Sequence, residues 1–392
     1  MKIKQSTHLV IPLALVLLTV VGLTLFPVAC TTPSSPQPAI VLTPSDYGKA
    51  TPEPTHEMPW RVQLPLIVRA SPPLALPPPS PTPAPLDFEA VRADLQARGQ
   101  ELAFVKIGFH VGPGGNQRGL GEYLEALAAA GVPAFIKSVD DYAPCAQALD
   151  YNPENITVFR LTGGDLELPD YNLPAEVSAE QHWARILDAL PPGFDRRTWL
   201  EVMNEPDKER AGWLGRFAFH TAQLALRDGY KFAAFGWSSG EPEPKHWETP
   251  EMLNFLNLAA QHPEQIAVAL HEYSYDVEDI ANMYPYLVGR FQALFSICDR
   301  NDTPRPTVLI TEWGWGSGSV PPPDQAMTDI AWASRLYAAY PQAKGAAIWY
   351  LGGGYGIADQ AQRLILPLRE YALRNYFVVQ QDQQPADSSL FQ

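Results

Sequence analysis

The sequence has few cysteines and few basic residues for its length. Three cysteines occur in 392 residues, too few for a disulfide-stapled scaffold. Lys and Arg total 28 against 43 Asp and Glu, which gives a formal net charge of −15. A nucleic-acid partner needs a basic face to bind phosphates, so this balance argues against one. The charge leaves small molecules and neutral polymers as the expected partners.

The motifs that usually hold metals and phosphates are also missing. The sequence has no His-x-x-x-His pair, no Cys-x-x-Cys pair and no phosphate-binding loop that ends in lysine. Two glycine-rich stretches, Gly112–Gly115 and Gly352–Gly354, follow predicted strands. They either let the backbone approach a ligand or simply turn the chain. We expect no metal and no cofactor.

The first 30 residues have the layout of an export signal. Lys2 and Lys4 precede the uncharged apolar run Leu9–Ala29, and Cys30 follows directly. Three interpretations fit: a lipoprotein signal with Cys30 acylated, an uncleaved membrane anchor, or an ordinary cleaved signal. Each interpretation exports the rest of the chain and limits membrane contact to this segment. We therefore expect an extracellular or cell-surface protein, membrane-tethered in a bacterium.

Residues 31–85 form a proline-rich linker with 16 of the 40 prolines. Such a segment has too few apolar side chains to offset the entropy of ordering it, and proline keeps it extended. Met58–Val68 interrupts the linker with an apolar stretch that is either a strand docked on the domain or a patch within the linker. With Cys30 outside the fold, Cys145 and Cys298 are expected as buried free thiols on different sides of the domain.

From about residue 86 to 380, apolar strands alternate with amphipathic helices, which predicts βα units and a parallel sheet. Eight such units in roughly 290 residues predict a (β/α)8 TIM barrel. Residues 381–392 are predicted to be a disordered tail. The expected strands are Ala103–His110, Pro133–Val139, Thr157–Leu161, Trp199–Met203, Phe232–Trp237, Ile266–Leu270, Thr307–Thr311 and Gly345–Trp349. The expected helices are Leu86–Ala97, Leu120–Ala130, Ala143–Leu149, Ala179–Leu190, Arg210–Arg227, Pro250–Ala260, Val277–Cys298, Asp324–Tyr340 and Gln360–Tyr376.

Polar and aromatic residues gather at the C-terminal ends of the predicted strands, where TIM barrels carry their chemistry. Two strands each end in a glutamate, Glu205 in Glu-Val-Met-Asn-Glu-Pro and Glu312 in Ile-Thr-Glu-Trp-Gly. If both strands belong to one barrel, the two carboxylates face each other across its mouth. The other strand ends carry His110, Asp140, Asp141, Arg160, Asn204, Trp237, Glu241, His271, Tyr273, Trp313, Trp349 and Tyr350.

These motifs resemble the clan A glycoside hydrolases, and their wording is closest to glycoside hydrolase family 5. The resemblance covers about residues 100–375 and includes His271-Glu-Tyr273 and Trp349. It implies a retaining hydrolase of β-linked oligo- or polysaccharides, with Glu205 as acid/base and Glu312 as nucleophile. It also implies that Asn204 binds the sugar 2-OH. Trp349 is expected to lie under the reacting sugar.

The resemblance further places Tyr273 against Glu312, and His271 against the substrate or a carboxylate. The ionised Glu312 is expected to raise the pKa of Glu205, which keeps Glu205 an acid near neutral pH. Arg160 is either a substrate contact or a charge partner. Trp313 is either core or a sugar platform, as are Trp237 and Trp315.

One further carboxylate, Glu201, lies four residues before Glu205 and is expected to point into the barrel. An unpaired buried charge is costly, so we expect Glu201 to pair with Arg160 or a lysine. The function expected is that of an exported retaining glycosidase, a monomer with a carbohydrate substrate. The first alternative is a non-catalytic carbohydrate-binding barrel at the cell surface, and the second is a different barrel hydrolase or a structural surface protein. The sugar, the linkage and endo or exo action stay open.

Overall fold

The computed structural model describes residues 84–316, 318–380 and 383–391. The signal segment, Cys30, the linker up to residue 83 and Met58–Val68 lie outside the described residues. None of the helices in the described part is long and apolar enough to cross a membrane.

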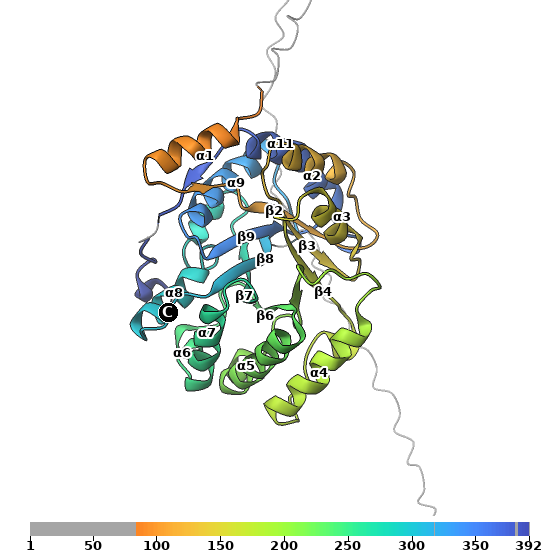
Figure 1. Ribbon diagram of the computed structural model, residues 1–392, viewed down its shortest axis with the longest axis vertical. Coiled ribbons are helices and arrows are strands. Elements are labelled where there is room, and N and C mark those ends of the chain that lie inside the picture. The colour runs from red at the N-terminus through yellow and green to blue at the C-terminus, as the bar shows by residue number, and fades with distance from the viewer. Residues whose placement is uncertain (1–83, 317, 381–382, 392) are drawn as a thin grey trace, which may run out of the picture. The chain divides into compact units, whose positions relative to one another are not determined.

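Eight parallel strands close into a barrel in sequential order, which confirms the predicted TIM barrel (Figure 1). Nearly every strand residue is buried, as expected for a parallel sheet that packs on both faces. The barrel strands are β2 (Ile107–Val111), β3 (Phe135–Val139), β4 (Ile156–Arg160), β5 (Trp199–Glu201), β6 (Lys231–Trp237), β7 (Ile266–Ser274), β8 (Thr307–Trp315) and β9 (Ala343–Ile348).

The helices surround this barrel, and their apolar faces pack against it (Figure 1). They are α1 (Phe88–Ala97), α2 (Leu120–Ala129), α3 (Ala143–Tyr151), α4 (Ala175–Ala189), α5 (Ala211–Asp228), α6 (Pro244–Trp247), α7 (Pro250–Gln261), α8 (Phe291–Arg300), α9 (Pro323–Ala338), α10 (Ala358–Gln362) and α11 (Ile365–Ala372). Four 3₁₀ turns accompany them: η1 (Gly164–Leu166), η2 (Lys208–Arg210), η3 (Ile280–Met283) and η4 (Ser388–Phe391).

The barrel interior is filled by one side chain or two from each of seven strands. Phe135 and Trp199 supply bulk, and small residues such as Ala233 and Ala267 face them. Gly345 leaves room for Phe135, since a Cβ there would lie 2.1 Å from its ring. Because side chains alternate along a strand, Lys137 lies above Phe135 on the same face, toward the C-terminal end of the barrel.

The predicted first strand, Ala103–His110, is divided in the structure. Residues Leu102–Ala103 form β1, which pairs antiparallel with β10 (Phe377–Val378) outside the barrel, and the barrel strand begins only at Ile107. Two other strands are longer than predicted: β7 runs to Ser274 and β8 to Trp315. This extension places His271, Tyr273 and Glu312 within strands, where backbone pairing fixes their positions.

Two predicted helices are also wrong in extent. The segment Val277–Cys298 contains only the turn η3 before α8 begins at Phe291, because Pro285 and Gly289 intervene and Gly289 has a φ of 90°. The predicted helix Gln360–Tyr376 is divided into α10 and α11. Pro367 stands in the first turn of α11, where its missing N–H costs nothing.

The described part of the predicted disordered tail is ordered. Residues 383–391 end in η4, and Phe391 is fully buried. The backbone N–H of Ala386 donates to Gln292 of α8 at 2.9 Å, and Arg290 donates to the carbonyl of Phe391 at 3.3 Å. The segment was predicted to be disordered because its composition is mostly polar. The buried ring of Phe391 supplies the apolar contact that orders it.

Cys145 lies on α3 and Cys298 on α8, and both are buried free thiols, as predicted. Burial raises the pKa of the Cys145 thiol well above its usual value. Both side chains therefore act as small apolar residues in the helix–barrel interface.

Candidate functional site

The structure brings most of the predicted site residues to one mouth of the barrel. His110 lies on β2, Arg160 ends β4, and Asn204 and Glu205 follow β5. His271 and Tyr273 lie on β7, Glu312 lies on β8, and Trp349 follows β9. All of these positions are at the C-terminal strand ends, the usual place for chemistry in a TIM barrel.

Glu205 is held in an unusual backbone conformation. Its φ is 45°, a left-handed value that few residues other than glycine adopt, and its N–H donates to the carbonyl of Gly236 at 2.9 Å. The side chain is 46% exposed. Backbone strain of this kind is found most often at functional sites. Here it presents the carboxylate to solvent rather than to the barrel interior.

His271 lies between the two predicted carboxylates. Its Nδ1 donates to Oε1 of Glu205 at 3.2 Å and lies 3.6 Å from Oε2 of Glu312. Because this one nitrogen lies close to both carboxylates, Oε1 of Glu205 and Oε2 of Glu312 can be no farther apart than the two distances added together. The two carboxyl groups that sequence reasoning paired are thus neighbours in the fold.

Glu312 is nearly buried and is surrounded by donors. The hydroxyl of Tyr273 donates to Oε2 at 2.7 Å, as predicted, and Nη2 of Arg160 donates to Oε1 at 3.2 Å. Burial alone would raise the pKa of this carboxyl, but the nearby charges, chiefly His271 and Arg160, hold the pKa well below its usual range. Glu312 is therefore ionised at neutral pH.

The predicted rise in the pKa of Glu205 is wrong for this structure. The hydrogen bond from His271 lowers that pKa below its usual value and outweighs both partial burial and the repulsion from Glu312. The sequence argument counted the like charge on Glu312 but not the effect of a hydrogen bond from His271 on the pKa of Glu205.

A buried network of alternating charges lies beneath Glu205 and Glu312. Lys137 donates to Oε1 of Glu201, and Nη1 of Arg160 donates to the same oxygen at 3.0 Å. The prediction that Glu201 pairs with Arg160 or a lysine is confirmed, and both partners are present. Burial would raise the pKa of Glu201, but Lys137 and Arg160 lower it to about 2. Arg160 therefore acts as a charge partner that links Glu201 to Glu312, and it also donates to Oδ1 of Asn204.

Trp349 lines the mouth at the centre of an aromatic wall. Its ring centroid lies 6.0 Å from that of Tyr273, 5.5 Å from that of Tyr350 and 4.6 Å from that of Tyr355. Sequence reasoning missed Tyr355, because this residue follows the strand end by several positions, within a glycine-rich loop. The wall gives one side of the mouth a continuous apolar surface.

Of the two interpretations of Trp313, core or sugar platform, the structure favours core. Its side chain is fully buried and packs edge-on against Trp315, with ring centroids 5.3 Å apart. Trp237 is also fully buried, beside Trp247. Both tryptophans therefore stabilise the layer between strands and helices. Trp315 is almost as buried, and although its edge reaches the mouth, its indole N–H is used to donate to Asp329 at 2.7 Å.

Of the other strand-end candidates, some lie at the mouth and some make structural contacts elsewhere. His110 is buried beside Glu312, with its Nδ1 3.9 Å from Oε1, and burial lowers its pKa well below the usual value. Asp140 lines the mouth and accepts from the N–H of Thr162 at 2.7 Å. Asp141 accepts from the N–H of Ala143 at the start of α3, a local turn contact between residues two apart. Glu241 pairs with Lys208 away from the mouth.

The two glycine-rich stretches pack against each other. A Cβ on Gly115 would lie 1.8 Å from the carbonyl oxygen of Leu351, and one on Gly353 would lie 2.5 Å from that of Gly114. The N–H of Gly353 donates to the carbonyl of Pro113 at 2.9 Å. Glycine therefore allows the backbones of these two loops to pack closely against each other. The packed loops support the side of the mouth near Tyr355.

Two hollows open at this mouth, with volumes of about 560 and 310 Å³. Glu205, Glu312 and Trp349 line both of them. Glu167 and Thr162 line the larger hollow, and Ser238, Ser239 and Tyr275 line the smaller. Sequence reasoning assigned no role to these five residues, which lie in the loops that follow β4, β6 and β7.

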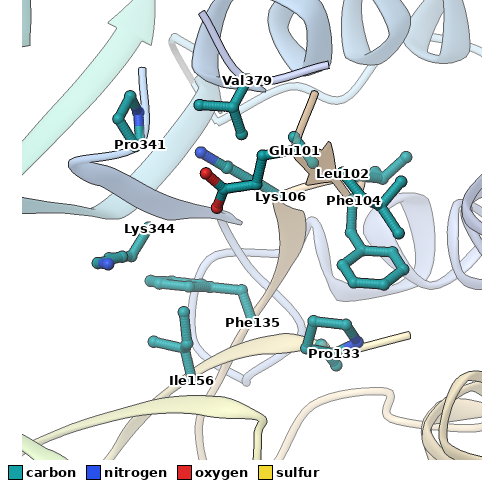
Figure 2. A pocket seen from close by; sticks show the side chains of 13 residues that line it. Glu101, Leu102, Phe104, Lys106, Pro133, Phe135, Ile156, Pro341, Lys344 and Val379 are labelled. Atoms are coloured by element: carbon teal, nitrogen blue, oxygen red, sulfur yellow. The ribbon is translucent and has the colours of Figure 1, made fainter. Parts of the chain in front are cut away.

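A third hollow of about 250 Å³ lies at the opposite, N-terminal end of the barrel (Figure 2). It is mostly apolar, with Phe135 and Ile156 on its wall. The Lys106 ammonium donates to the carbonyls of Tyr337, Tyr340 and Ala343 at 2.8 to 3.1 Å. All three of its N–H donors are thus used to bind the end of α9 and the chain that follows. This end of a TIM barrel usually serves stability, and the contacts here agree.

Across residues 84–316, 318–380 and 383–391, no group of three or more His, Cys, Asp or Glu side chains has metal-binding geometry. The chemistry available at the mouth is that of two adjacent carboxylates in different surroundings. Glu312 is ionised, buried and held by several donors. Glu205 is exposed and hydrogen-bonded to an imidazole, so it can exchange protons with solvent or a ligand.

No protein-family model matches the chain, and no curated protein matches it. Among solved structures, it is similar to a mutant tryptophan synthase α-subunit from the hyperthermophile Pyrococcus furiosus, with 11% identity and a TM-score of 0.31. That match covers 69% of this chain and 97% of the other. A likeness at this level carries no argument about function.

Proposed function

We propose that this chain is a retaining glycoside hydrolase that acts on β-linked oligo- or polysaccharides. The observation that carries the proposal is the placement of Glu205 and Glu312 within 3.2 and 3.6 Å of one histidine nitrogen at an open barrel mouth. Retaining glycosidases need two carboxyl groups about 5–5.5 Å apart, and the shared contact with His271 supports such a spacing. The motif resemblance supports the same conclusion.

In the first step, the ionised Glu312 attacks the anomeric carbon and forms a covalent ester with the sugar. The bond from the anomeric carbon to the leaving sugar's oxygen breaks, and Glu205 gives its proton to that oxygen. The contacts from Tyr273 and Arg160 orient Glu312 for this attack. Its near-burial limits competition from water.

In the second step, Glu205 is ionised and takes a proton from a water molecule. The water oxygen attacks the anomeric carbon, the ester bond breaks, and Glu312 is released as a carboxylate. Two inversions at the same carbon give net retention. Glu205 suits the role of proton exchanger because, at 46% exposure, its side chain can reach water directly.

Several groups at the mouth are suited to bind sugar hydroxyls. His110 lines the larger hollow, and its two ring nitrogens have no hydrogen-bond partner among the residues that the structure describes. Because Oδ1 of Asn204 already accepts from Arg160, its Nδ2 is the group left to donate to a ligand. Trp349 offers an apolar face to the C–H groups of a ring.

One observation favours the alternative of a non-catalytic carbohydrate-binding barrel. A general acid must be protonated, and the hydrogen bond from His271 lowers the pKa of Glu205. A permanently ionised Glu205 could accept hydrogen bonds from sugar hydroxyls but could not protonate a leaving group. The enzyme proposal therefore requires that substrate binding raises the pKa of Glu205, either by excluding water or by displacing His271.

The test is hydrolysis of soluble β-glucan, mannan and xylan by the parent chain, Glu205→Gln and Glu312→Gln. Glu241→Gln is the matched control, because Glu241 lies past another strand end and contacts Lys208 instead of the site. We expect both site variants to lose at least about 10³-fold in kcat, and the control to lose nothing. Binding of these glycans without hydrolysis by the parent would establish the alternative instead.

Chemical rescue separates the two roles. Azide added to Glu312→Ala should yield a glycosyl azide of inverted configuration, because azide takes the nucleophile's place. Azide added to Glu205→Ala should yield the retained configuration, because the ester on Glu312 still forms. A parent product of inverted configuration would contradict the retaining mechanism.

The proposal places the activity outside the cell. It rests on the signal-like segment before Cys30 and on the linker that follows, both of which precede the described residues. Metabolic labelling with a palmitate analogue, compared with Cys30→Ser, tests the lipid anchor.

A further inference from the structure

The barrel mouth is hollowed on both sides of the carboxylate pair. Asp140 and Tyr355 line the larger hollow, and Ser239 and Tyr275 line the smaller. Both include Glu205 and Glu312 in their walls. A pocket closed on one side of the reacting bond admits only a chain end. A mouth hollowed on both sides has room for sugars before and after the bond.

The wall of each hollow includes an exposed tyrosine. Tyr355 is 63% exposed and Tyr275 is 66% exposed, the two highest values among the large apolar side chains of the described residues. The ring of Tyr355 continues the aromatic wall from Trp349, with centroids 4.6 Å apart. Aromatic rings with free faces are suited to pack on the C–H faces of sugar rings. Since Tyr355 lines only the larger hollow and Tyr275 only the smaller, the two rings are suited to contact different parts of a bound chain.

The charge around the mouth is negative. Asp140, Glu167, Glu205 and Glu312 line the larger hollow, and Arg160 is the only Lys or Arg among the described residues of its wall. That guanidinium already donates to Glu201, Asn204 and Glu312. The described wall of the smaller hollow has no Lys or Arg. A polymer with carboxylates would meet repulsion on both sides, and the chain's net charge of −15 adds to it.

From these features we propose that the mouth binds an uncharged polysaccharide chain across both hollows, between Tyr355 and Tyr275, and cleaves it internally. The inference rests on the proposed glycosidase function and deepens it. It specifies endo action, which the sequence left open, and it makes polyuronides and other anionic glycans poorer substrates than neutral ones.

The mode of cleavage is tested with the full chain on soluble neutral β-glucan, mannan and xylan. Viscosity and new reducing ends are followed together. Internal cleavage should halve the viscosity while only a small fraction of the bonds is broken, and the early products should be oligosaccharides. Release of a single small sugar at nearly constant viscosity would overturn this inference and leave the proposed function intact. No hydrolysis of any glycan would instead overturn the proposed function, and this inference with it.

The two tyrosines are tested as Tyr275→Ala and Tyr355→Ala. Each should lower kcat/KM on the polymer about tenfold, since an aromatic contact of this kind contributes about one decade in binding. Each should change hydrolysis of a short aryl glycoside less, because so short a substrate cannot fill both hollows. Tyr151→Ala is the matched control, as Tyr151 is an exposed tyrosine at the end of α3. Equal loss on both substrates, or no loss on the polymer, would count against the assignment.

The charge preference is tested with two derivatives of whichever polysaccharide is cleaved. The hydroxyethyl derivative is neutral and the carboxymethyl derivative is anionic, and their substituents are similar in size. The carboxymethyl form should be cleaved at least about tenfold more slowly at low ionic strength, and the difference should shrink as salt screens the charges. Equal or faster cleavage of the anionic form at low salt would overturn the preference.

Discussion

Nη2 of Arg160 lies 3.2 Å from Oε1 of Glu312, and both side chains are nearly buried. The same guanidinium donates to Glu201 through Nη1 at 3.0 Å. Arg160 thus joins a carboxylate inside the barrel to the one proposed as nucleophile. A planar guanidinium can hold two carboxylates at fixed angles, which a lysine at this position could not do.

Replacing Arg160 by methionine should impair catalysis through Glu312. We expect kcat to fall about 10²-fold, the usual loss when one electrostatic contact at a reacting group is removed. The pKa of Glu312 should rise, so the acid limb of the kcat/KM profile should move to higher pH. Arg300→Met serves as control, because Arg300 pairs with Glu248 at the exposed surface. An acid limb that stays in place would show that Arg160 does not act through Glu312.

Replacing His271 by alanine should change the alkaline limb of the kcat/KM profile. The hydrogen bond from Nδ1 lowers the pKa of Glu205, so its loss should raise that pKa. A general acid works only while protonated, and activity should therefore persist to higher pH than in the parent. The measurement is kcat/KM against pH on one soluble substrate. A shift of the alkaline limb to lower pH would contradict the contact described here.

The buried pair of Lys137 and Glu201 should matter for stability. Lys137→Met leaves Glu201 with fewer partners and should cost about 3–5 kcal/mol in the free energy of unfolding. Adding Glu201→Gln removes the unpaired charge and should recover part of that loss. Lys245→Met, at an exposed position on α6, should change stability by less than about 0.5 kcal/mol. Denaturant titration measures all four proteins, and a double variant less stable than the single one would refute this account.

Glu272 should make stability depend on pH. It is fully buried on β7 and accepts from the N–H groups of Gly289 and Phe291 and from the hydroxyl of Tyr337. Burial outweighs these donors and raises its pKa to about 7. The folded protein therefore holds this proton more tightly than the unfolded chain does. The stability it contributes is complete below about pH 4.5 and is lost as pH rises toward 7.

The measurement for Glu272 is the unfolding free energy of the parent and of Glu272→Gln between pH 4.5 and 8. The glutamine cannot accept all three hydrogen bonds and should cost about 1–3 kcal/mol at the acid end. Because only the parent has a buried group to ionise, the difference between the two proteins should shrink as pH rises. A difference that grows with pH would show that the donors, and not burial, dominate.

Features with a local physical cause could be predicted from the sequence alone. The alternation of strands and helices, the two strand-end glutamates and the pairing need of Glu201 follow from local pattern and from the cost of a buried charge. The alternation and the pairing of Glu201 are confirmed, whereas Glu312 lies within β8 and Glu205 lies four residues after the end of β5. The helix predicted over Val277–Cys298 was wrong because one proline and one glycine outweighed its apolar content.

Only the tertiary structure decided the register in which neighbouring strands pair. Leu270 pairs with Ile310, but the register then shifts and His271 pairs with Glu312, skipping Thr311. A shift of one residue sends side chains to the opposite face of a strand. The shift brings His271 beside Glu312. It also decides that Trp313 is buried, and it helps bring Glu205 within reach of the imidazole that lowers its pKa. Residue order along one strand carries no information about such a shift, because it arises from the fit between two strands in a closed barrel.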